Sequence, residues 1–258
     1  MTDPVHTLRD DRVGIIELAR PEKYNCLSMQ AWTAIDTARR AFEANDTVRA
    51  ILIRSRGEHF CTGADLDEVK TLRHDLEKTQ AFTDLGHGAL LALESSPLPV
   101  IAAVQGLCLA GGLELMLGAD IVFASKSARI GDQHAQYGLI PGWGGSQRLP
   151  RLLGQRRALD LMFSAQWLSA EEALAIGLVN YICDDEDLWT EAMAYAQNLS
   201  RRSRQGLAEM KRLVRAGSDC DREAAMSLEA QAAARHIIGP DTAEGLAAFE
   251  ARRKPEFG

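Results

Sequence analysis

The 258-residue sequence has few of the side chains that build metal sites and disulfide frameworks. Its five cysteines form no CxxC pair, and its six histidines show no HxxxH or HExxH spacing. This pattern argues against a metal site and against a disulfide scaffold. We expect a reduced, cytoplasmic protein whose cysteines pack as small apolar side chains. They are Cys26, Cys61, Cys108, Cys183 and Cys220.

Positive charge and targeting signals are also scarce. The 29 Lys and Arg residues are outnumbered by 36 Asp and Glu, which gives a net charge of −7. Nonspecific nucleic-acid binding needs a field of basic side chains, so nucleic acid is not an expected partner. A small anionic ligand is still compatible with this charge, because backbone N–H groups can hold it. The N-terminus has no apolar core and no basic start, so we expect no signal peptide.

Long apolar runs are limited to one segment, residues 100–117. It contains Gln105, Glu114 and three glycines. A membrane-spanning helix seldom holds an ionised side chain, so we interpret the segment as a buried strand, a turn and a buried helix. We expect no membrane partner.

Alternating strands and helices dominate the first part of the chain, which predicts an α/β fold with mostly parallel strands. At about 150 residues per domain, the length predicts one large domain or a domain with an appendage. The expected strands are 12–18, 50–55, 97–104, 121–124 and 179–182, and the expected helices are 28–45, 79–94 and 111–118. Ser28 is expected to cap the first helix.

The pattern becomes mainly helical from Ser169 onward. Ser169 with Glu172 fits a capping box, and Asp241 with Glu244 fits the same logic. The acidic run 184–187 fits a helix start, where the macrodipole favours negative charge. A helical C-terminal part therefore follows the α/β core.

Glycine is concentrated where no common nucleotide motif occurs. The dinucleotide fingerprint GxGxxG, the P-loop and the hydrolase elbow GxSxG are all absent. Even so, nine of the 21 glycines lie between residues 106 and 145. Strand-to-glycine-to-helix loops are expected at 59–66, 105–115 and 138–149, and two such loops facing each other would form an oxyanion hole. Tight packing alone is the alternative for any single glycine pair.

Six ordered blocks resemble the enoyl-CoA hydratase/isomerase (crotonase) superfamily over nearly the whole chain. They are RPEKYNCL (20–27), GEHFCTGADL (57–66), PLPVIAAVQGLCLAGGLELMLGADIVFAS (97–125), GLIPGWGGSQRLPRLLG (138–154), LSAEEALAIGLVNYI (168–182) and AEGLAAFEARRKPEF (243–257). The resemblance implies a crotonase-like spiral of β-β-α turns over residues 1–195 and a helical region over 196–258 that assembles homotrimers or hexamers. It also implies acyl-CoA thioester substrates and no cofactor beyond their CoA moiety.

The same resemblance implies an oxyanion hole formed by the backbone N–H groups of Ala64 and Gly111. Two preorganised donors would stabilise the negative charge of a thioester enolate. Glu114 matches one of the two glutamates that flank the acyl group in the similar hydratases. A buried glutamate is usually paired or functional, so a buried ion pair or a surface-facing carboxylate is the alternative interpretation.

His134 occupies the position of the second glutamate and is the main departure from the family pattern. A histidine accepts and donates a proton near neutral pH, so it can still act as the acid/base partner of Glu114. A purely structural histidine is the alternative. Asp132, two positions earlier, either orients His134 or caps a turn.

The resemblance also implies residues that bind CoA and the acyl group. The CoA and substrate residues are Lys23, Tyr24 and Cys26 along the adenine end, with Asp65, Leu66, Pro141 and Gly142. The acyl pocket is expected to involve Leu66, Leu139, Ile140, Pro141 and Trp143, where Trp143 either restricts the pocket or packs outward. Lys23 is also consistent with a solvated surface lysine. Asp65, Asp67 and Glu68 fit the acids of a helix start better than a metal cluster.

We therefore expect hydration of a trans-2-enoyl-CoA to a 3-hydroxyacyl-CoA through a stabilised enolate. Double-bond isomerisation is the first alternative, and thioester or C–C hydrolysis is the next, because one oxyanion hole supports all of these. The alternative from another class is a non-catalytic acyl-CoA-binding or RNA-binding relative. The intact loops and the acidic charge argue against it.

Overall fold

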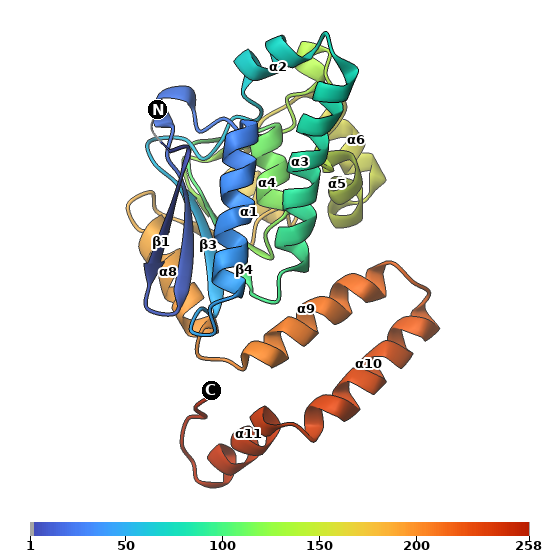
Figure 1. Ribbon diagram of the computed structural model, residues 1–258. Helices are drawn as coiled ribbons and strands as arrows, with labels where there is room; N and C mark the ends of the chain where they lie inside the picture. The colour runs from blue at the N-terminus through green and yellow to red at the C-terminus, as the bar shows by residue number, and fades with distance from the viewer. Residues whose placement is uncertain (1–2, 258) are drawn as a thin grey trace.

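The computed structural model describes residues 3–257 and shows an α/β fold with two sheets (Figure 1). The larger sheet has the strand order β1-β2-β3-β4-β6-β9, and the smaller sheet has the order β5-β7-β8. The strands are β1 Val5–Asp10, β2 Val13–Leu18, β3 Ala50–Ser55, β4 Val100–Val104, β5 Leu107–Leu109, β6 Ile121–Ser125, β7 Arg129–Gly131, β8 Leu168–Ser169 and β9 Tyr181–Cys183. Residues 1–2 and 258 lie outside the described part. The prediction that the N-terminus holds no signal peptide falls partly on residues 1–2.

Helices form the rest of the regular structure. They are α1 Met29–Glu43, α2 Leu66–Leu72, α3 Leu76–Ser95, α4 Gly111–Leu117, α5 Gly145–Leu153, α6 Gln155–Ser164, α7 Ala170–Ala175, α8 Leu188–Leu199, α9 Arg204–Ser218, α10 Arg222–Ile237 and α11 Pro240–Glu250, with short 3-10 helices η1 Pro21–Lys23 and η2 Ala135–Tyr137. No helix among residues 3–257 has both the length and the apolar character needed to cross a membrane.

The larger sheet is mostly parallel, as predicted. Only β1 and β2 pair antiparallel, and the pairs from β2 through β9 are all parallel. Strand β1 was not predicted, because Val5 is its only buried residue and the alternation of apolar and polar residues is weak. The strand expected at 97–104 begins at Val100, after two prolines that have no N–H for sheet pairing. The smaller sheet also escaped prediction, since its strands are only two or three residues long.

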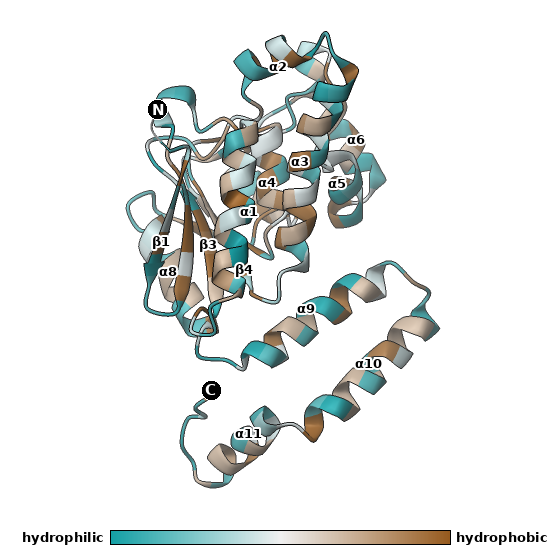
Figure 2. Ribbon diagram, in the orientation of Figure 1, coloured by the Kyte–Doolittle hydropathy of each residue, from teal (hydrophilic) through white to brown (hydrophobic). Residues whose placement is uncertain are grey.

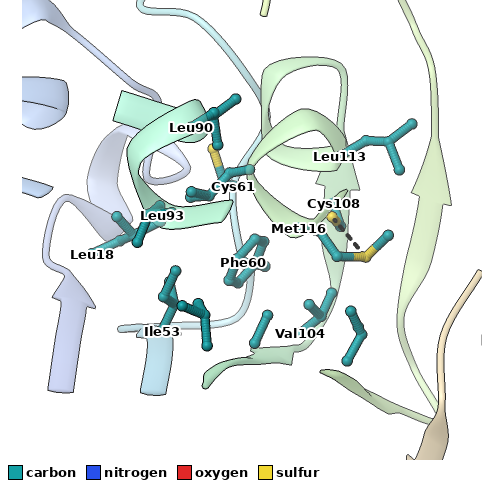
Figure 3. Packing of buried hydrophobic residues seen from close by; sticks show 14 of the residues in the cluster. Leu18, Ile53, Phe60, Cys61, Leu90, Leu93, Val104, Cys108, Leu113 and Met116 are labelled. Carbon is teal, nitrogen blue, oxygen red and sulfur yellow. Dashed lines mark hydrogen bonds between the residues drawn. The ribbon is translucent and has the colours of Figure 1, made fainter. Parts of the chain in front are cut away.

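Both faces of the larger sheet are covered by helices. One face packs on α1, α3 and α4, and the other packs on α8. Figure 3 shows the first layer, with Phe60 and Cys61 lying between Leu93 of α3 and Met116 of α4. The Cys108 thiol contacts the Met116 sulfur at 3.9 Å. This core fixes the two loops, 56–65 and 105–110, that lead into the candidate site.

Local signals placed several helix starts correctly. The Ser28 hydroxyl accepts a hydrogen bond from the Ala31 N–H, as expected of the cap of α1. The Asp65 carboxylate accepts bonds from the first turn of α2, which confirms the helix-start interpretation of that acidic cluster. The Ser169–Glu172 capping box is also present. Helix α3 begins three residues before the expected Thr79, at Leu76, behind an Asp75 cap.

Two local predictions were wrong. The capping box expected at Asp241 does not form, because α11 starts two residues earlier, with Gly239 as its cap and Pro240 at its first position. Asp241 instead accepts a bond from the Ser203 hydroxyl, and Glu244 pairs with Arg253. Cys220 is exposed, unlike the other four cysteines, so it is not a core side chain.

The last three helices, α9 to α11, extend away from the sheet (Figure 1). Figure 2 shows apolar positions along these helices. Several large apolar side chains in this region are exposed. They include Met210, Val214, Met226, Ile237, Ile238, Leu246 and Phe249. The expected boundary at 195/196 falls within α8, which packs against the sheet.

Candidate active site

Two backbone N–H groups are left unused where the loops before α2 and α4 meet. In the described chain, neither the Ala64 N–H nor the Gly111 N–H donates a hydrogen bond. Gly63 has φ 107°, and a methyl group there would come within 3.0 Å of the Gly111 nitrogen. The preceding Ala110 also has a positive φ, 50°, which is strained for a residue with a side chain. The loops therefore hold two unused donors close together.

Glu114 lies beside these donors and is fully buried. Its Oε1 accepts the N–H groups of Trp143 and Gly145, each at 2.8 Å. Its Oε2 is buried and has no hydrogen-bond partner within residues 3–257. Burial raises the pKa of Glu114, and although the two N–H groups and His134 oppose this, the net pKa is above its usual value. One oxygen is thus fixed, and the other is available to a ligand.

His134 lies between two buried carboxylates. Its Nδ1 is 2.9 Å from Asp132 Oδ1, and its Nε2 is 3.8 Å from Glu114 Oε2. Asp132 Oδ1 also accepts the His134 backbone N–H at 3.1 Å. Burial lowers the pKa of His134, but the bond and charge of Asp132 and the charge of Glu114 outweigh burial and raise it. Asp132 therefore orients the ring, and Nε2 points toward Glu114.

Trp143 packs inward, beneath the Gly111 loop. It is 4% exposed and makes edge contacts with the rings of Trp32 and Phe82. A methyl group at Gly111 or at Gly86 would come within 2.4 Å of the Trp143 ring. The indole therefore requires glycine at both positions. Of the two alternatives, outward packing is excluded, and the ring forms the floor under the unused Gly111 donor.

An apolar cavity opens between α2 and the segment around η2. Its volume is about 380 Å³, and its lining consists of Leu66, Val69, Lys70, Arg73, Tyr137 and Leu139. The structure thus brings the expected residues Leu66 and Leu139 together. Ile140 does not line this cavity and is 83% exposed. Pro141 lies closer to Glu114, since both residues contact the position of a methyl group at Gly145.

A second cavity, of about 370 Å³, lies on the other side of α2 and is polar. Lys23 lines it and is not a free cation, because its Nζ lies 3.0 Å from Asp67 and 3.9 Å from Asp65. Arg20, which was not a predicted site residue, pairs with Asp65 at 3.0 Å. Any phosphate bound here has to compete with these carboxylates.

Tyr24, Cys26 and Gly142 lie near these features without forming one site. The exposed Tyr24 ring stacks on His59 at 5.2 Å. Burial and the nearby Asp65 raise the pKa of the Cys26 thiol to about 11, so it is a poor nucleophile. Gly142 faces α3, where a methyl group would meet Thr83 at 3.8 Å.

Known proteins match the chain over almost its full length. The enoyl-CoA hydratase/isomerase family matches residues 9–258. This chain belongs to that family. It is 32% identical over 250 residues to the crotonyl-CoA hydratase of Syntrophomonas wolfei, covering 96% of this chain and 95% of the relative. It is also 32% identical over 249 residues to the short-chain-enoyl-CoA hydratase of Clostridium acetobutylicum, with the same two coverages of 96% and 95%.

Solved structures agree with these relatives. The crystal structure of an enoyl-CoA hydratase from Polaromonas sp. JS666 superimposes with a TM-score of 0.95 at 29% identity, covering 98% of this chain and 99% of that one. The enoyl-CoA hydratase/isomerase fold of this chain is therefore established. No group of three or more His, Cys, Asp or Glu that could hold a metal occurs in residues 3–257.

Sequence reasoning also missed an ion pair behind the site of this family member. Arg148 on α5 pairs with Glu94 on α3 and donates to the Trp143 carbonyl oxygen. In the sequence, the only indication of this ion pair was an arginine soon after the glycines of the 138–154 block. Its partner is 54 residues away in sequence.

Proposed function

We propose that this enzyme adds water to a trans-2-enoyl-CoA and forms a 3-hydroxyacyl-CoA. One observation supports this most directly: the partnerless Glu114 Oε2 faces His134 Nε2 at 3.8 Å, beside the unused N–H groups of Ala64 and Gly111. A water molecule can contact two such atoms at once. The site thus offers a proton acceptor, a proton donor and an anion hole.

In the proposed reaction, the thioester oxygen accepts hydrogen bonds from Ala64 and Gly111. Glu114 takes a proton from water as the oxygen attacks the β-carbon, and the π electrons move to the thioester oxygen as an enolate. His134 then gives its Nε2 proton to the α-carbon as the enolate collapses. The proton on Glu114 must return to His134 or to solvent before the next turnover. Each proton-transfer group in such a reaction typically contributes about 10²–10⁴ in rate.

This mechanism needs Glu114 ionised and His134 protonated at the same time. The rate then rises with pH as Glu114 ionises, and it falls as His134 loses its proton. Because both pKa values are raised, both limbs should lie above the usual values of 4.5 and 6.5. A bell-shaped profile with displaced limbs is the expected signature.

The apolar cavity between α2 and η2 supports binding of an acyl chain against Leu66 and Leu139. The polar cavity beyond α2 supports binding of the CoA nucleotide near Lys23, once Lys23 exchanges a carboxylate for a phosphate. We propose that Tyr24, Cys26, Asp65, Pro141 and Gly142 contribute contacts around these cavities. No cofactor beyond the CoA moiety is required.

The C-terminal helices support a further part of this proposal. We propose that residues 196–258 assemble the enzyme as a homotrimer or hexamer in the cytoplasm. Apolar side chains are exposed here in the single chain: Ile238, directly after α10, is 86% exposed, and Phe249 of α11 is 83% exposed. Burial of such surface drives association.

Double-bond isomerisation is the second candidate, because one carboxylate oxygen without a partner can shuttle a proton between two carbons. Separate assays with crotonyl-CoA and a 3-enoyl-CoA distinguish the two activities. Loss of the conjugated-enoyl absorbance from crotonyl-CoA indicates a hydratase, whereas its growth from the 3-enoyl substrate indicates an isomerase. Either activity should collapse in Glu114→Gln, and only hydration should depend strongly on His134.

A further inference from the structure

Arg148 anchors the loop that holds Glu114. Its Nη1 donates to the Trp143 carbonyl oxygen at 2.6 Å. The same guanidinium makes a two-point ion pair with Glu94 of α3, with Nε–Oε1 at 2.7 Å and Nη2–Oε2 at 2.8 Å. The two side chains are 12% and 14% exposed, so solvent screens this pair weakly. All three contacts use the planar fork that lysine lacks.

The loop is shaped to admit this guanidinium. Gly144 has φ 101°, and a methyl group there would come within 2.0 Å of Arg148 Nη1. Glycine is thus required for both the left-handed backbone and the space. The Arg148 side chain packs directly against the turn between Trp143 and Gly145.

The same turn holds the catalytic carboxylate. The Trp143 carbonyl oxygen accepts a hydrogen bond from Arg148. The backbone N–H groups of Trp143 and Gly145 both donate to Glu114 Oε1. A shift of this turn therefore moves both donors to Oε1 at once. It would also weaken the hold on the carboxylate, since both hydrogen bonds to Glu114 come from this turn.

We propose that Arg148, held by Glu94, is a positioning residue that acts through the Trp143–Gly145 turn on Glu114. This inference rests on the proposed role of Glu114 as the proton acceptor. Arg148 itself donates to Glu94 and Trp143 and lies behind the turn, so its effect on the reaction is indirect. The expected consequence is a fixed orientation of Oε2 toward His134.

The anchor continues into the C-terminal helices. Arg215 of α9 lies 3.3 Å from Glu94 and 2.9 Å from Asp120. Lys211, one turn earlier, lies 2.7 Å from Asp120 and donates to the Leu93 carbonyl oxygen at 3.1 Å. Arg215→Gln should therefore lower kcat, as the loss of Arg148 does, but by a smaller factor.

The test compares Arg148→Lys with Arg151→Gln. Arg151 lies on the same helix, is exposed, and donates only to Gln147 in the described chain. In Arg148→Lys we expect kcat to fall about tenfold with KM changed less than about twofold, because the carboxylate is misplaced while substrate contacts remain. Arg151→Gln should match the wild type.

The titration of the Glu114 carboxyl reports directly on its surroundings. Infrared difference spectroscopy of enzyme with ¹³C-labelled glutamate measures it, and the band missing in Glu114→Gln assigns the signal to this residue. The Trp143 and Gly145 N–H groups lower the pKa of Glu114, so weakening them should raise it, and the acid limb of activity should move to higher pH. The other titratable groups that face Glu114 are His134 and Asp132. Cys108, under the same helix, contacts Met116.

A folded Arg148→Lys enzyme with wild-type kcat and an unchanged Glu114 titration would overturn the proposal. The proposal would also be overturned if Arg151→Gln changed kcat and the Glu114 titration as much as Arg148→Lys does. If Arg148→Lys does not fold, Glu94→Gln supplies the same two readouts while leaving the bond to Trp143 in place. A wild type without activity on any enoyl-CoA would refute the proposed function, but the infrared titration would still test the anchor.

Discussion

At the scale of single residues, the candidate site is defined by groups left without partners. Glu114 Oε2 and Asp132 Oδ2 are both buried without a hydrogen bond in the described residues, on the two sides of His134. Leaving a buried charged oxygen without a partner costs free energy, and such groups concentrate at functional sites. The N–H groups of Ala64 and Gly111 also lack hydrogen-bond acceptors in the described residues.

Asp132→Asn should shift the pH range of activity. Asparagine keeps an oxygen for the His134 ring but removes the charge that raises the His134 pKa. Burial still lowers the His134 pKa, and less charge opposes it, so this pKa should fall. The alkaline limb of the pH–rate profile, where His134 loses its proton, should therefore move to lower pH. An unchanged alkaline limb in a folded variant would show that Asp132 only caps the turn.

The site residues were predictable only in part. Glu114 stood out as a lone acid in an apolar helix, and the glycine loops around Ala64 and Gly111 stood out by composition. The role of Asp132 remained open, because the sequence does not show whether its Oδ1 atom reaches the His134 ring. Arg148 and Glu94 could not be paired from the sequence, since the pairing depends on how α5 packs beside α3.

At the scale of elements, α3 supplies the support for the site. Trp143 fits against Gly86 of this helix. A methyl group at Gly88, two residues further on, would meet no atom within 4 Å. The helix therefore contains one glycine that packing requires and one that packing does not. Its apolar pattern predicted the helix but could not separate these two glycines.

Gly88→Ala and Gly86→Ala should have opposite effects on stability. Alanine at position 88 gains helix propensity of about 1 kcal/mol. Alanine at position 86 would approach the Trp143 ring to 2.4 Å, and such overpacking costs about 1–3 kcal/mol. Denaturant unfolding of both variants measures the difference. Equal stabilities would mean that the indole is not held against Gly86.

The apolar cavity gives a prediction about substrate length. Leu139→Trp should fill part of the space between α2 and η2. We expect KM to rise several-fold for a long-chain enoyl-CoA and to change little for crotonyl-CoA, because a short chain leaves that space unused. Ile140→Trp, on a neighbouring exposed residue outside the cavity, is the control. Equal effects on both chain lengths would place the acyl tail elsewhere.

At the scale of the whole molecule, the α/β core and the C-terminal helices were both visible in the sequence. Strand β3 matched its expected range, and the mostly parallel order followed from alternating elements. The second sheet, strand β1 and the start of α11 were not foreseen. Each depends on a tertiary contact or a backbone cap that competes with the local pattern.

The proposed assembly through the C-terminal helices can be tested by sedimentation velocity. Phe249→Lys places a charge on an exposed apolar side chain of α11, and Glu250→Lys introduces the same charge at the adjacent exposed position. We expect the first variant to dissociate at concentrations where the wild type and the second variant stay assembled. A wild type that sediments as a monomer would contradict the assembly proposal.

The most direct test of the account is hydration of crotonyl-CoA, followed by loss of enoyl absorbance with identification of the product. The wild type should form 3-hydroxybutyryl-CoA. Glu114→Gln and His134→Gln should each lower kcat by about 10²–10⁴, because each removes one proton-transfer group. Wild-type turnover in either folded variant, or no hydration by the wild type, would contradict the assignment of Glu114 and His134 as the acid/base pair of a hydratase.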